Sequence, residues 1–419
     1  MASELLKGFR MLDLADEKGA LCGKMFADMG ADVIKVEPPV GCSTRTIPPF
    51  LDDVPGPERS FYALAYHAGK RSVTANLDSA DGRALLADLA ATADFLVESH
   101  EVGYLDSIGL GYDELSRGNP RLIYTSIMPF GDKGPGRDYK WADIISWAAG
   151  GMMFLMGEEG KPPIQMSLPQ AGLHAGAEAS VASLLAHYPR QVDGRGQRVI
   201  VNMQACIVWT LMNEQAMPIL HGDYLRRSGR FTGRADLRRT AVYRCKDGHI
   251  SSLLGGGPVG APSTKALVQW MIEKGFAADW MKTKEWASWV PGMFMELSDE
   301  DRFQIKDFED RVQKFFLTMT KREIYEETLK RRILLAPVAT VADIAADPQL
   351  KAREFFVDIN YDTLGRTLRL PGAFAKLSET PIGPGSRAPR VGEHNRDVYC
   401  GLLGMSAGRL EELRARRAI

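Results

Sequence analysis

The chain has 419 residues, of which 45% are hydrophobic and 25% charged, and its 52 basic residues nearly balance 53 acidic ones. This composition is typical of a globular protein, and the length predicts at least two domains. The formal net charge of -1 gives no electrostatic basis for binding nucleic acid or an anionic membrane.

The first part of the chain alternates predicted strands with predicted helices. The strands are expected at 9–14, 32–36, 72–75, 95–98 and 122–126, and the helices at 20–29, 80–92 and 112–116. Strand, helix and strand within about 30 residues form a parallel βαβ unit. Repeated units predict a mostly parallel sheet with helices on both faces. The first strand-to-helix turn lacks G-x-G-x-x-G, which disfavours a nicotinamide-dependent redox enzyme, although a ligand can still bind at the carboxyl ends of such strands.

The next predicted helix, from Pro169 to about His187, is rich in small residues. These are Ala171, Gly172, Ala175, Gly176, Ala179, Ala182, Ser183 and Ala186. Small side chains allow another backbone to approach closely, so tight packing is the plainer interpretation of this helix. A polar loop at 157–163 precedes it.

Beyond this helix the pattern changes to a second set of elements. We expect a strand at 199–201, a helix at 203–217, an Arg-rich linker at 222–239, a hairpin within 241–254, helices from 263 to 332, a β-rich section from 347 and a basic C-terminal helix at 407–417. The linker fits a solvated arm or an anion-binding loop. The glycines after the hairpin, Gly255, Gly256 and Gly257, indicate a flexible lid or a place where backbone contacts a ligand.

Cysteine and histidine patterns exclude further classes of site. The five cysteines are odd in number, far apart and without a C-x-x-C pair, which favours a reducing compartment and disfavours structural zinc. No H-E-x-x-H motif occurs. The first ten residues lack the apolar core of a signal peptide, and no apolar run is long enough to cross a bilayer. We therefore expect a cytoplasmic protein with no metal site and no membrane span.

Short segments through nearly the whole chain resemble one known family. They are ADMGADVIKVEPP at 27–39, GKRSV at 69–73, IGLGY at 108–112, NPRLIY at 119–124, PV at 337–338, DPQ at 347–349 and VGEH at 391–394. Their content and order resemble the family III coenzyme A transferases, which include formyl-CoA transferase and α-methylacyl-CoA racemase. The resemblance implies an α/β fold. Its large domain, with a parallel sheet and Rossmann-like units, would come from 1–222 and 336–419, with a smaller α+β domain at 223–335. It also implies an interlocked, ring-like dimer.

The resemblance fails at the catalytic position. Family transferases use an aspartate, in a D-x-x-x-G pattern at the start of a helix, to attack the acyl-CoA thioester. Here the segment reads LPQAG, and Leu168 stands at the aspartate's position without a lone pair. Ala142 replaces the histidine of the racemase branch. We therefore expect no catalytic residue in this chain. Glu158 and Glu159 are the nearest alternatives in sequence, either as a relocated carboxylate or as a solvated loop pair.

The segments that bind coenzyme A in the family also lack expected charged residues in this chain. Glu101 stands in place of an arginine, Ser107 in place of a second one, and Cys42 in place of an acid. Other family features survive and are the candidate contacts to coenzyme A: Lys70, Lys140, Met203, Gly255, Gly256 and Gly257. The plainer interpretation of both lysines is that they lie on the surface.

Three hypotheses follow from the resemblance. In the first, the chain is the non-catalytic subunit of a heterodimer or heterotetramer, and a related subunit carries the aspartate. The type it resembles is succinyl-CoA:(R)-benzylsuccinate CoA-transferase of anaerobic toluene degradation. Coenzyme A or acyl-CoA would then be a substrate of the complex, with no permanently bound cofactor. In the second, the chain is an active homodimer with a relocated carboxylate. In the third, it binds acyl-CoA without turnover.

Overall fold

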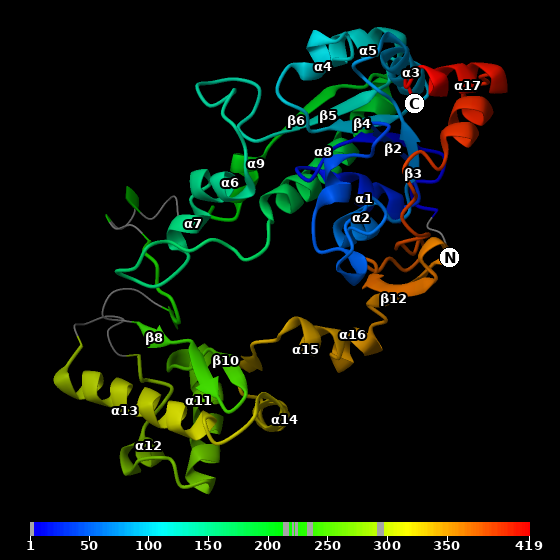
Figure 1. Cartoon of the computed structure of the whole chain (residues 1–419). Helices are drawn as coiled ribbons and strands as arrows, with labels where there is room; N and C mark the ends of the chain where they lie inside the picture. Colours follow the sequence, from blue (N-terminus) through cyan, green and yellow to red (C-terminus); the bar gives the residue numbers. More distant parts are fainter. Residues whose placement is uncertain (1–3, 213–217, 220–221, 223–224, 233–237, 291–296) are drawn as a thin grey trace. The chain divides into compact units, whose positions relative to one another are not determined.

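The computed structural model describes residues 4–212, 218–219, 222, 225–232, 238–290 and 297–419. The chain forms two compact units (Figure 1). The first comprises Met1–Met153, Gln165–Asp223 and Pro348–Ile419, and the second comprises Phe154–Ile164 and Tyr224–Asp347. These limits differ from the expected domains in two places: the loop at 154–164 belongs to the second unit, and that unit continues to Asp347 instead of ending at 335. There the guanidinium of Arg227 lies 5.1 Å from the centre of the Phe154 ring, which holds the loop in place.

In the described residues, the first unit contains a six-stranded parallel sheet in the order β3-β2-β1-β4-β5-β6. The strands are β1 (Arg10–Leu14), β2 (Asp32–Glu37), β3 (Arg71–Thr74), β4 (Phe95–Glu98), β5 (Ile123–Met128) and β6 (Arg198–Asn202). The expected α/β fold is confirmed. The order reverses between β1 and β4, which is the arrangement of a doubly wound nucleotide-binding sheet.

Successive side chains along the strands point to opposite faces of the sheet, and each face carries its own hydrophobic core. Met11 and Val33 face one side with α1 (Ala20–Asp28), α8 (Ala171–Asp193) and α9 (Met203–Trp209). Their neighbours Leu12 and Ile34, which are paired across β1 and β2, face the other side. That second core includes α3 (Ala80–Ala91), α5 (Tyr112–Gly118) and α17 (Ala407–Ala415). The sheet is therefore buried on both faces, as a parallel sheet requires.

The small residues of α8 pack against α1, as the plainer interpretation expected. A Cβ added to Gly172 would lie 2.3 Å from the carbonyl oxygen of Glu17, and one on Gly176 would lie 3.0 Å from Cβ of Leu21. The helix limits were predicted wrongly: α8 begins at Ala171 and continues to Asp193, where Gly194 ends it with φ 77°.

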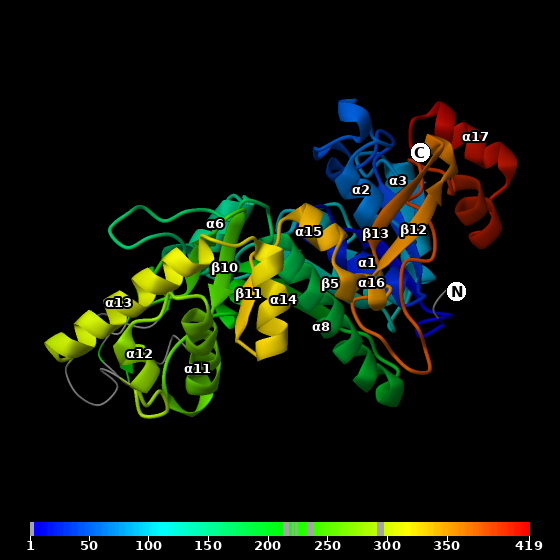
Figure 2. The same ribbon diagram turned by 90° about the horizontal axis from the view of Figure 1, so that it is seen from below.

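The C-terminal part of the chain returns to the first unit. Figure 2 shows the hairpin of β12 (Phe356–Tyr361) and β13 (Arg366–Pro371) near α1 and α2 (Phe61–Tyr66). The Tyr361 hydroxyl donates to the carbonyl of Leu64 at 2.6 Å, which fixes the hairpin to α2. Further short elements belong to the unit: α4 (Tyr104–Ser107), α6 (Asp143–Ala149), α7 (Met152–Leu155), which crosses the unit boundary, α16 (Pro348–Ala352), the short 3-10 helices η1 (Ser43–Thr46), η2 (Leu51–Asp53) and η4 (Asp362–Leu364), and the π-helix η5 (Asp397–Leu402).

The second unit is built around an antiparallel sheet and an aromatic core. The expected hairpin is present as β9 (Val242–Cys245) and β10 (Gly248–Ser252), and β11 (Leu335–Pro337) pairs with β10. Its other elements are β7 (Phe231–Thr232), β8 (Arg239–Thr240), α11 (Gly257–Glu273), α12 (Asp279–Thr283), α13 (Asp299–Phe316), α14 (Lys321–Arg331) and α15 (Val341–Ala345). Strands β7 and β8 lie where a linker was expected. The end of the helix expected at 203–217 falls partly outside the described residues, and α9 stops at Trp209.

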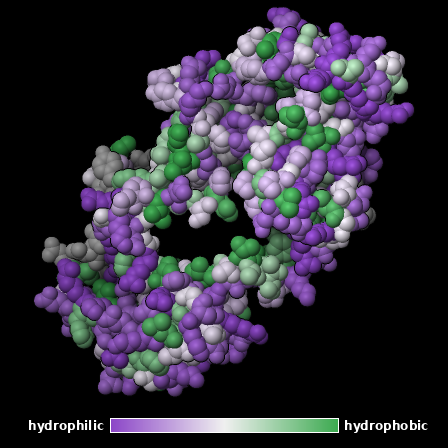
Figure 3. Space-filling model, in the orientation of Figure 1, coloured by the Kyte–Doolittle hydropathy of each residue, from purple (hydrophilic) through white to green (hydrophobic). Residues whose placement is uncertain are grey.

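The surface agrees with the balanced composition. Hydrophilic residues predominate on the face shown in Figure 3, and hydrophobic residues form smaller patches among them. Within the described part of the chain, no helix combines the length and apolar character needed to cross a bilayer.

Candidate functional site

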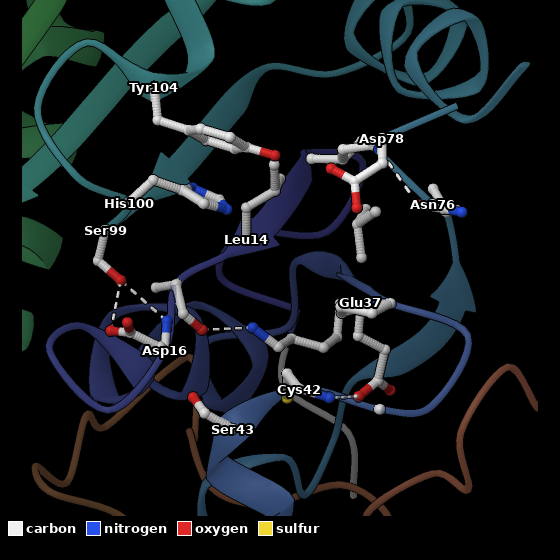
Figure 4. Close-up of a pocket in the computed structure, with 17 residues that line it drawn as sticks. Leu14, Asp16, Glu37, Cys42, Ser43, Asn76, Asp78, Ser99, His100 and Tyr104 are labelled. Atoms are coloured by element: carbon white, nitrogen blue, oxygen red, sulfur yellow. Dashed lines mark hydrogen bonds between the residues drawn. The ribbon is translucent and has the colours of Figure 1, made fainter. Parts of the chain in front are cut away.

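A cavity of about 320 Å³ opens at the carboxyl ends of β1, β2, β3 and β4 (Figure 4). Parallel strands end at one edge of a sheet, so the residues that follow them meet there. The lining residues are Leu14, Ala15, Asp16, Lys35, Val36, Glu37, Pro38, Gly41, Cys42, Ser43, Ala75, Asn76, Leu77, Asp78, Ser99, His100 and Tyr104. The cavity therefore lies where the strand order reverses, the usual ligand position in open α/β sheets.

The turn after β1 is held by hydrogen bonds to the turn after β4. The Ser99 hydroxyl donates to Oδ1 of Asp16 at 2.7 Å, and the Asp16 amide donates to Oγ of Ser99 at 2.9 Å. The other carboxylate oxygen of Asp16 binds the Lys18 ammonium. The negative charge of Asp16 is therefore already matched by a cation.

Glu37 closes the end of β2 as a buried ion pair. Its two carboxylate oxygens accept from Nε and Nη2 of Arg45, each at 2.8 Å, and Oε1 also accepts from the Ser72 hydroxyl at 2.5 Å. Burial alone would raise the pKa of Glu37, but the hydrogen bonds from Arg45 hold it below its usual value. Glu37 also accepts from the Cys42 amide at 3.1 Å, so the loop with the unexpected cysteine is still anchored.

Lys70 lies in the interior beneath the cavity. It is 3% exposed and does not line the cavity, so the interpretation as a surface lysine was wrong. Its ammonium donates to Oδ2 of Asp13 at 2.5 Å and to the carbonyl of Ala20 at 3.2 Å. Lys35 approaches Oδ1 of the same carboxylate at 3.4 Å. Lys70 therefore belongs to a buried cluster of charges with Asp13 and Lys35.

One wall of the cavity is aromatic and the opposite wall is acidic. The rings of His100 and Tyr104 stack with centroids 5.2 Å apart and planes at 24°. Figure 4 shows these rings on one side of Leu14, with Asn76 and Asp78 on the other. The Asp78 amide donates to Oδ1 of Asn76 at 3.1 Å, and the Asp78 carbonyl accepts from Nη1 of Arg83 at 3.1 Å. Sequence reasoning missed Tyr104 and Asp78, although Asp78 follows a predicted strand.

The remaining coenzyme candidates do not line this cavity. Lys140 is exposed and its ammonium lies 2.7 Å from Oε1 of Glu101, the residue that replaces an arginine. Met203 is fully buried at the start of α9. In the second unit, a Cβ on Gly256 would lie 1.6 Å from the carbonyl oxygen of Trp289, so packing alone requires a glycine there. That these residues contact coenzyme A stays a prediction.

Leu168 is 67% exposed and lies just before α8. The first helical amide, that of Ala171, instead donates to Oδ1 of Asp143 at 2.7 Å, so a side chain from another helix satisfies this helix end. The alternative carboxylates belong to the second unit and each has a cation as partner. Glu158 lies 2.6 Å from the Lys161 ammonium, and Glu159 binds Arg238. Within the described residues, no group of His, Cys, Asp and Glu is placed to hold a metal ion.

Comparisons with known proteins agree with this fold. Residues 6–395 match the model of CoA-transferase family III. The chain is 34% identical to succinyl-CoA:(R)-benzylsuccinate CoA-transferase subunit BbsE of Thauera aromatica, over 94% of this chain and 93% of that protein. It is 29% identical to succinyl-CoA–L-malate CoA-transferase beta subunit of Chloroflexus aurantiacus, over 99% and 98%. Among solved structures, a CAIB/BAIF family protein from Brucella suis is 28% identical, with a TM-score of 0.79 over 96% of this chain and 100% of that one.

Proposed function

Because this chain belongs to CoA-transferase family III, we propose that it is the non-catalytic subunit of a heteromeric CoA-transferase. A related subunit carries the nucleophilic aspartate and performs the covalent step. This chain provides the surface on which that subunit assembles. Family membership supports the transferase part of the proposal, and two relatives that are themselves named as subunits support the heteromeric part.

Leu168 is the observation that carries the proposal. A leucine side chain has no atom that can attack a thioester or form a mixed anhydride. Loss of the nucleophile from an enzyme that works by covalent catalysis costs on the order of a millionfold in turnover. The carboxylate of Asp143, which contacts the start of α8, is engaged there as an acceptor for the Ala171 amide at 2.7 Å.

A relocated nucleophile at Glu158 or Glu159 is the competing hypothesis. Hydrogen bonds from Lys161 and Arg238 lower the pKa of Glu158 and Glu159, respectively, and stabilise each anion. A carboxylate whose lone pairs are engaged by a cation is a weaker nucleophile. These contacts favour the solvated loop pair over the catalytic interpretation.

We infer the substrate class from the relatives. The proposed donor is succinyl-CoA, and the proposed acceptor is an aromatic or dicarboxylic acid such as benzylsuccinate. The relatives named above are a succinyl-CoA:(R)-benzylsuccinate and a succinyl-CoA–L-malate transferase, and their common donor supports succinyl-CoA more strongly than either acceptor.

The test compares the purified chain with the chain co-expressed with a related subunit that contains the aspartate. Transfer of CoA from succinyl-CoA to benzylsuccinate is followed by chromatography, and acyl-enzyme is trapped with hydroxylamine and located by mass spectrometry. We expect turnover and trapping in the complex alone, with the mark on the partner's aspartate. Turnover by the isolated chain at ordinary enzymic rates would reject the proposal, and a mark on Glu158 or Glu159 would establish the relocated carboxylate.

A further inference from the structure

A second cavity, of about 430 Å³, lies within the second unit and shares no lining residue with the strand-end cavity. Its lining comes from two segments that are far apart in the sequence: Phe154, Glu159, Gly160, Leu225, Arg226 and Arg227. We call it the arginine cleft. The two segments touch beside it, because a Cβ on Gly229 would lie 3.2 Å from Cγ of Glu158. Its two arginines belong to the segment at 222–239 that was expected to be a solvated arm or an anion-binding loop.

Arg227 is held in the arginine cleft by uncharged groups. Its Nη1 donates to the carbonyl oxygen of Phe154 at 2.7 Å, and its guanidinium lies 5.1 Å from the centre of the Phe154 ring. Neither contact brings a negative charge to the guanidinium. In the part of the chain that the structure describes, Nε of Arg227 is buried and has no hydrogen-bond partner. A buried donor on a charged group is costly to leave unpaired, so this atom points to an acceptor from outside the chain.

The acids beside the arginine cleft are already matched by other cations. Arg238 binds Glu159, and the Lys161 ammonium lies 2.6 Å from Glu158. The hydrogen bond from Arg238 is the largest cause of the lowered pKa of Glu159, and the charge of Arg226 acts in the same direction. Among the described residues, Nε of Arg238 is also buried without a partner. With both acids matched, the arginines that line the cleft give it a net positive potential.

The other lining side chains of the arginine cleft are apolar. Phe154 is 52% exposed, and Leu225 is partly buried. Guanidinium groups bind carboxylates and phosphates through two parallel N–H donors, whereas a phenyl ring and a leucine contact an apolar body. Inorganic phosphate would use the guanidinium groups alone. A volume of about 430 Å³ is within the range of small-molecule sites, about 300–1,000 Å³, and an organic acid with an apolar group fits both halves of the lining.

We propose that the arginine cleft binds a carboxylic acid with an apolar body, such as an aryl-substituted dicarboxylate. Arg226 and Arg227 hold its carboxylate, and Phe154 and Leu225 contact its apolar part. The chain then has a binding role of its own, in addition to its assembly with a catalytic subunit. The choice of acid rests on the proposed function, but the cleft and its charge do not.

The test is titration calorimetry of the full chain with benzylsuccinate, succinate and inorganic phosphate at low ionic strength. We expect benzylsuccinate to bind about tenfold more tightly than succinate, because its benzyl group buries apolar area against Phe154 and Leu225. Phosphate should bind most weakly, and all affinities should fall as salt is added. No binding of benzylsuccinate, or phosphate binding as tight as that of benzylsuccinate, would overturn the proposal.

Two variants and a matched control locate the two kinds of contact. Arg227→Lys keeps the positive charge but removes the planar pair of donors, so it should weaken the binding of both dicarboxylates about tenfold. Phe154→Leu should weaken benzylsuccinate more than succinate. Arg322→Lys changes an exposed arginine of α14 in the same unit and should alter neither affinity. Wild-type affinities in Arg227→Lys would contradict the assigned contact.

A third variant separates ligand binding from the structure of the loop at 154–164. Arg227 and Phe154 also hold this loop, so their substitution perturbs it. Glu159→Gln keeps an acceptor for Arg238 but removes a negative charge from the lining, and it should tighten benzylsuccinate binding about threefold. A purely structural role of these residues predicts no gain in affinity. Unchanged or weaker binding by this variant would argue against the assigned site.

The results distinguish this inference from the proposed function. Transfer of CoA by the complex, with no binding of benzylsuccinate to the isolated chain, would overturn the inference alone. Turnover by the isolated chain, with the expected order of affinities at the arginine cleft, would overturn the proposed function alone.

Discussion

The internal cluster of Asp13, Lys35 and Lys70 predicts an unequal response to the loss of its members. It places two ammonium groups against one buried carboxylate. Burial lowers the pKa of Lys70 despite the attraction of Asp13. Burial is also the largest influence on Lys35 and acts in the same direction, but there the charges of Asp13, Cys42, Glu37 and Asp16 together outweigh it and raise the pKa. Lys70 is therefore the less firmly held of the two cations.

We expect Asp13→Asn to be much more destabilising than Lys70→Met. Asp13→Asn removes the carboxylate that both buried ammonium groups contact, and removal of one partner from a buried ion pair costs about 3–5 kcal/mol. Lys70→Met keeps much of the side-chain volume and leaves Asp13 paired with Lys35. It loses the hydrogen bonds of Lys70 to Asp13 and to the Ala20 carbonyl, but no charge is left without a counter-charge, so we expect a cost of about 1.5–3 kcal/mol.

Hydrogen exchange followed by mass spectrometry is the appropriate assay, because a chain with two compact units need not unfold in one step. Peptides covering β1 and β3 should lose protection more in Asp13→Asn than in Lys70→Met. The exposed Lys140→Met serves as the control and should leave both peptides unchanged. Equal losses of protection in the Asp13 and Lys70 variants would refute the reasoning. A Lys70→Met variant that keeps its stability but loses binding of coenzyme A would also refute it.

Three further substitutions test packing, pH dependence and helix capping. Gly172→Ala places a methyl group against a carbonyl of the turn before α1 and should lower the hydrogen-exchange protection of peptides covering α1 and α8 by about 1–3 kcal/mol; unchanged protection would contradict the packing. Hydrogen bonds from Arg387 lower the pKa of Glu393 to about 2. The stabilisation that this ion pair gives to the folded state is therefore complete above the unfolded-state pKa near 4.5 and is lost as the pH falls toward 2. Glu393→Gln should therefore lower Tm at pH 7, and the Tm difference between the variant and the wild type should shrink as the pH is lowered. A Tm difference that does not change with pH would argue against the ion pair. Thr320→Ala removes the capping box of α14 and should weaken its amide protection by about 1 kcal/mol, whereas Thr320→Ser should not.

Much of the first unit could be predicted from local patterns. The strand at 95–98 was predicted with its observed limits, because three consecutive apolar residues between a turn and a polar loop, followed by Glu98, are buried in the sheet. The end of α8 was not predictable in this way. Pro189 suggests a stop before it, yet the helix continues to Asp193, where the buried guanidinium of Arg190 donates to the carbonyls of Asp94 and Arg121.

In the candidate site too, some features follow from the sequence alone and others depend on the tertiary structure. The lack of a nucleophile at Leu168 is a property of one side chain, so the sequence alone determines it. The place of Lys70 and the make-up of the cavity depend on partners far away in the chain. Asp13 and Lys70 are 57 residues apart, and Leu14, Asp78 and Tyr104 meet because parallel strands from separate βαβ units end at one edge. Burial and pairing of a charge depend on which strands become neighbours, and that was decided by the tertiary structure.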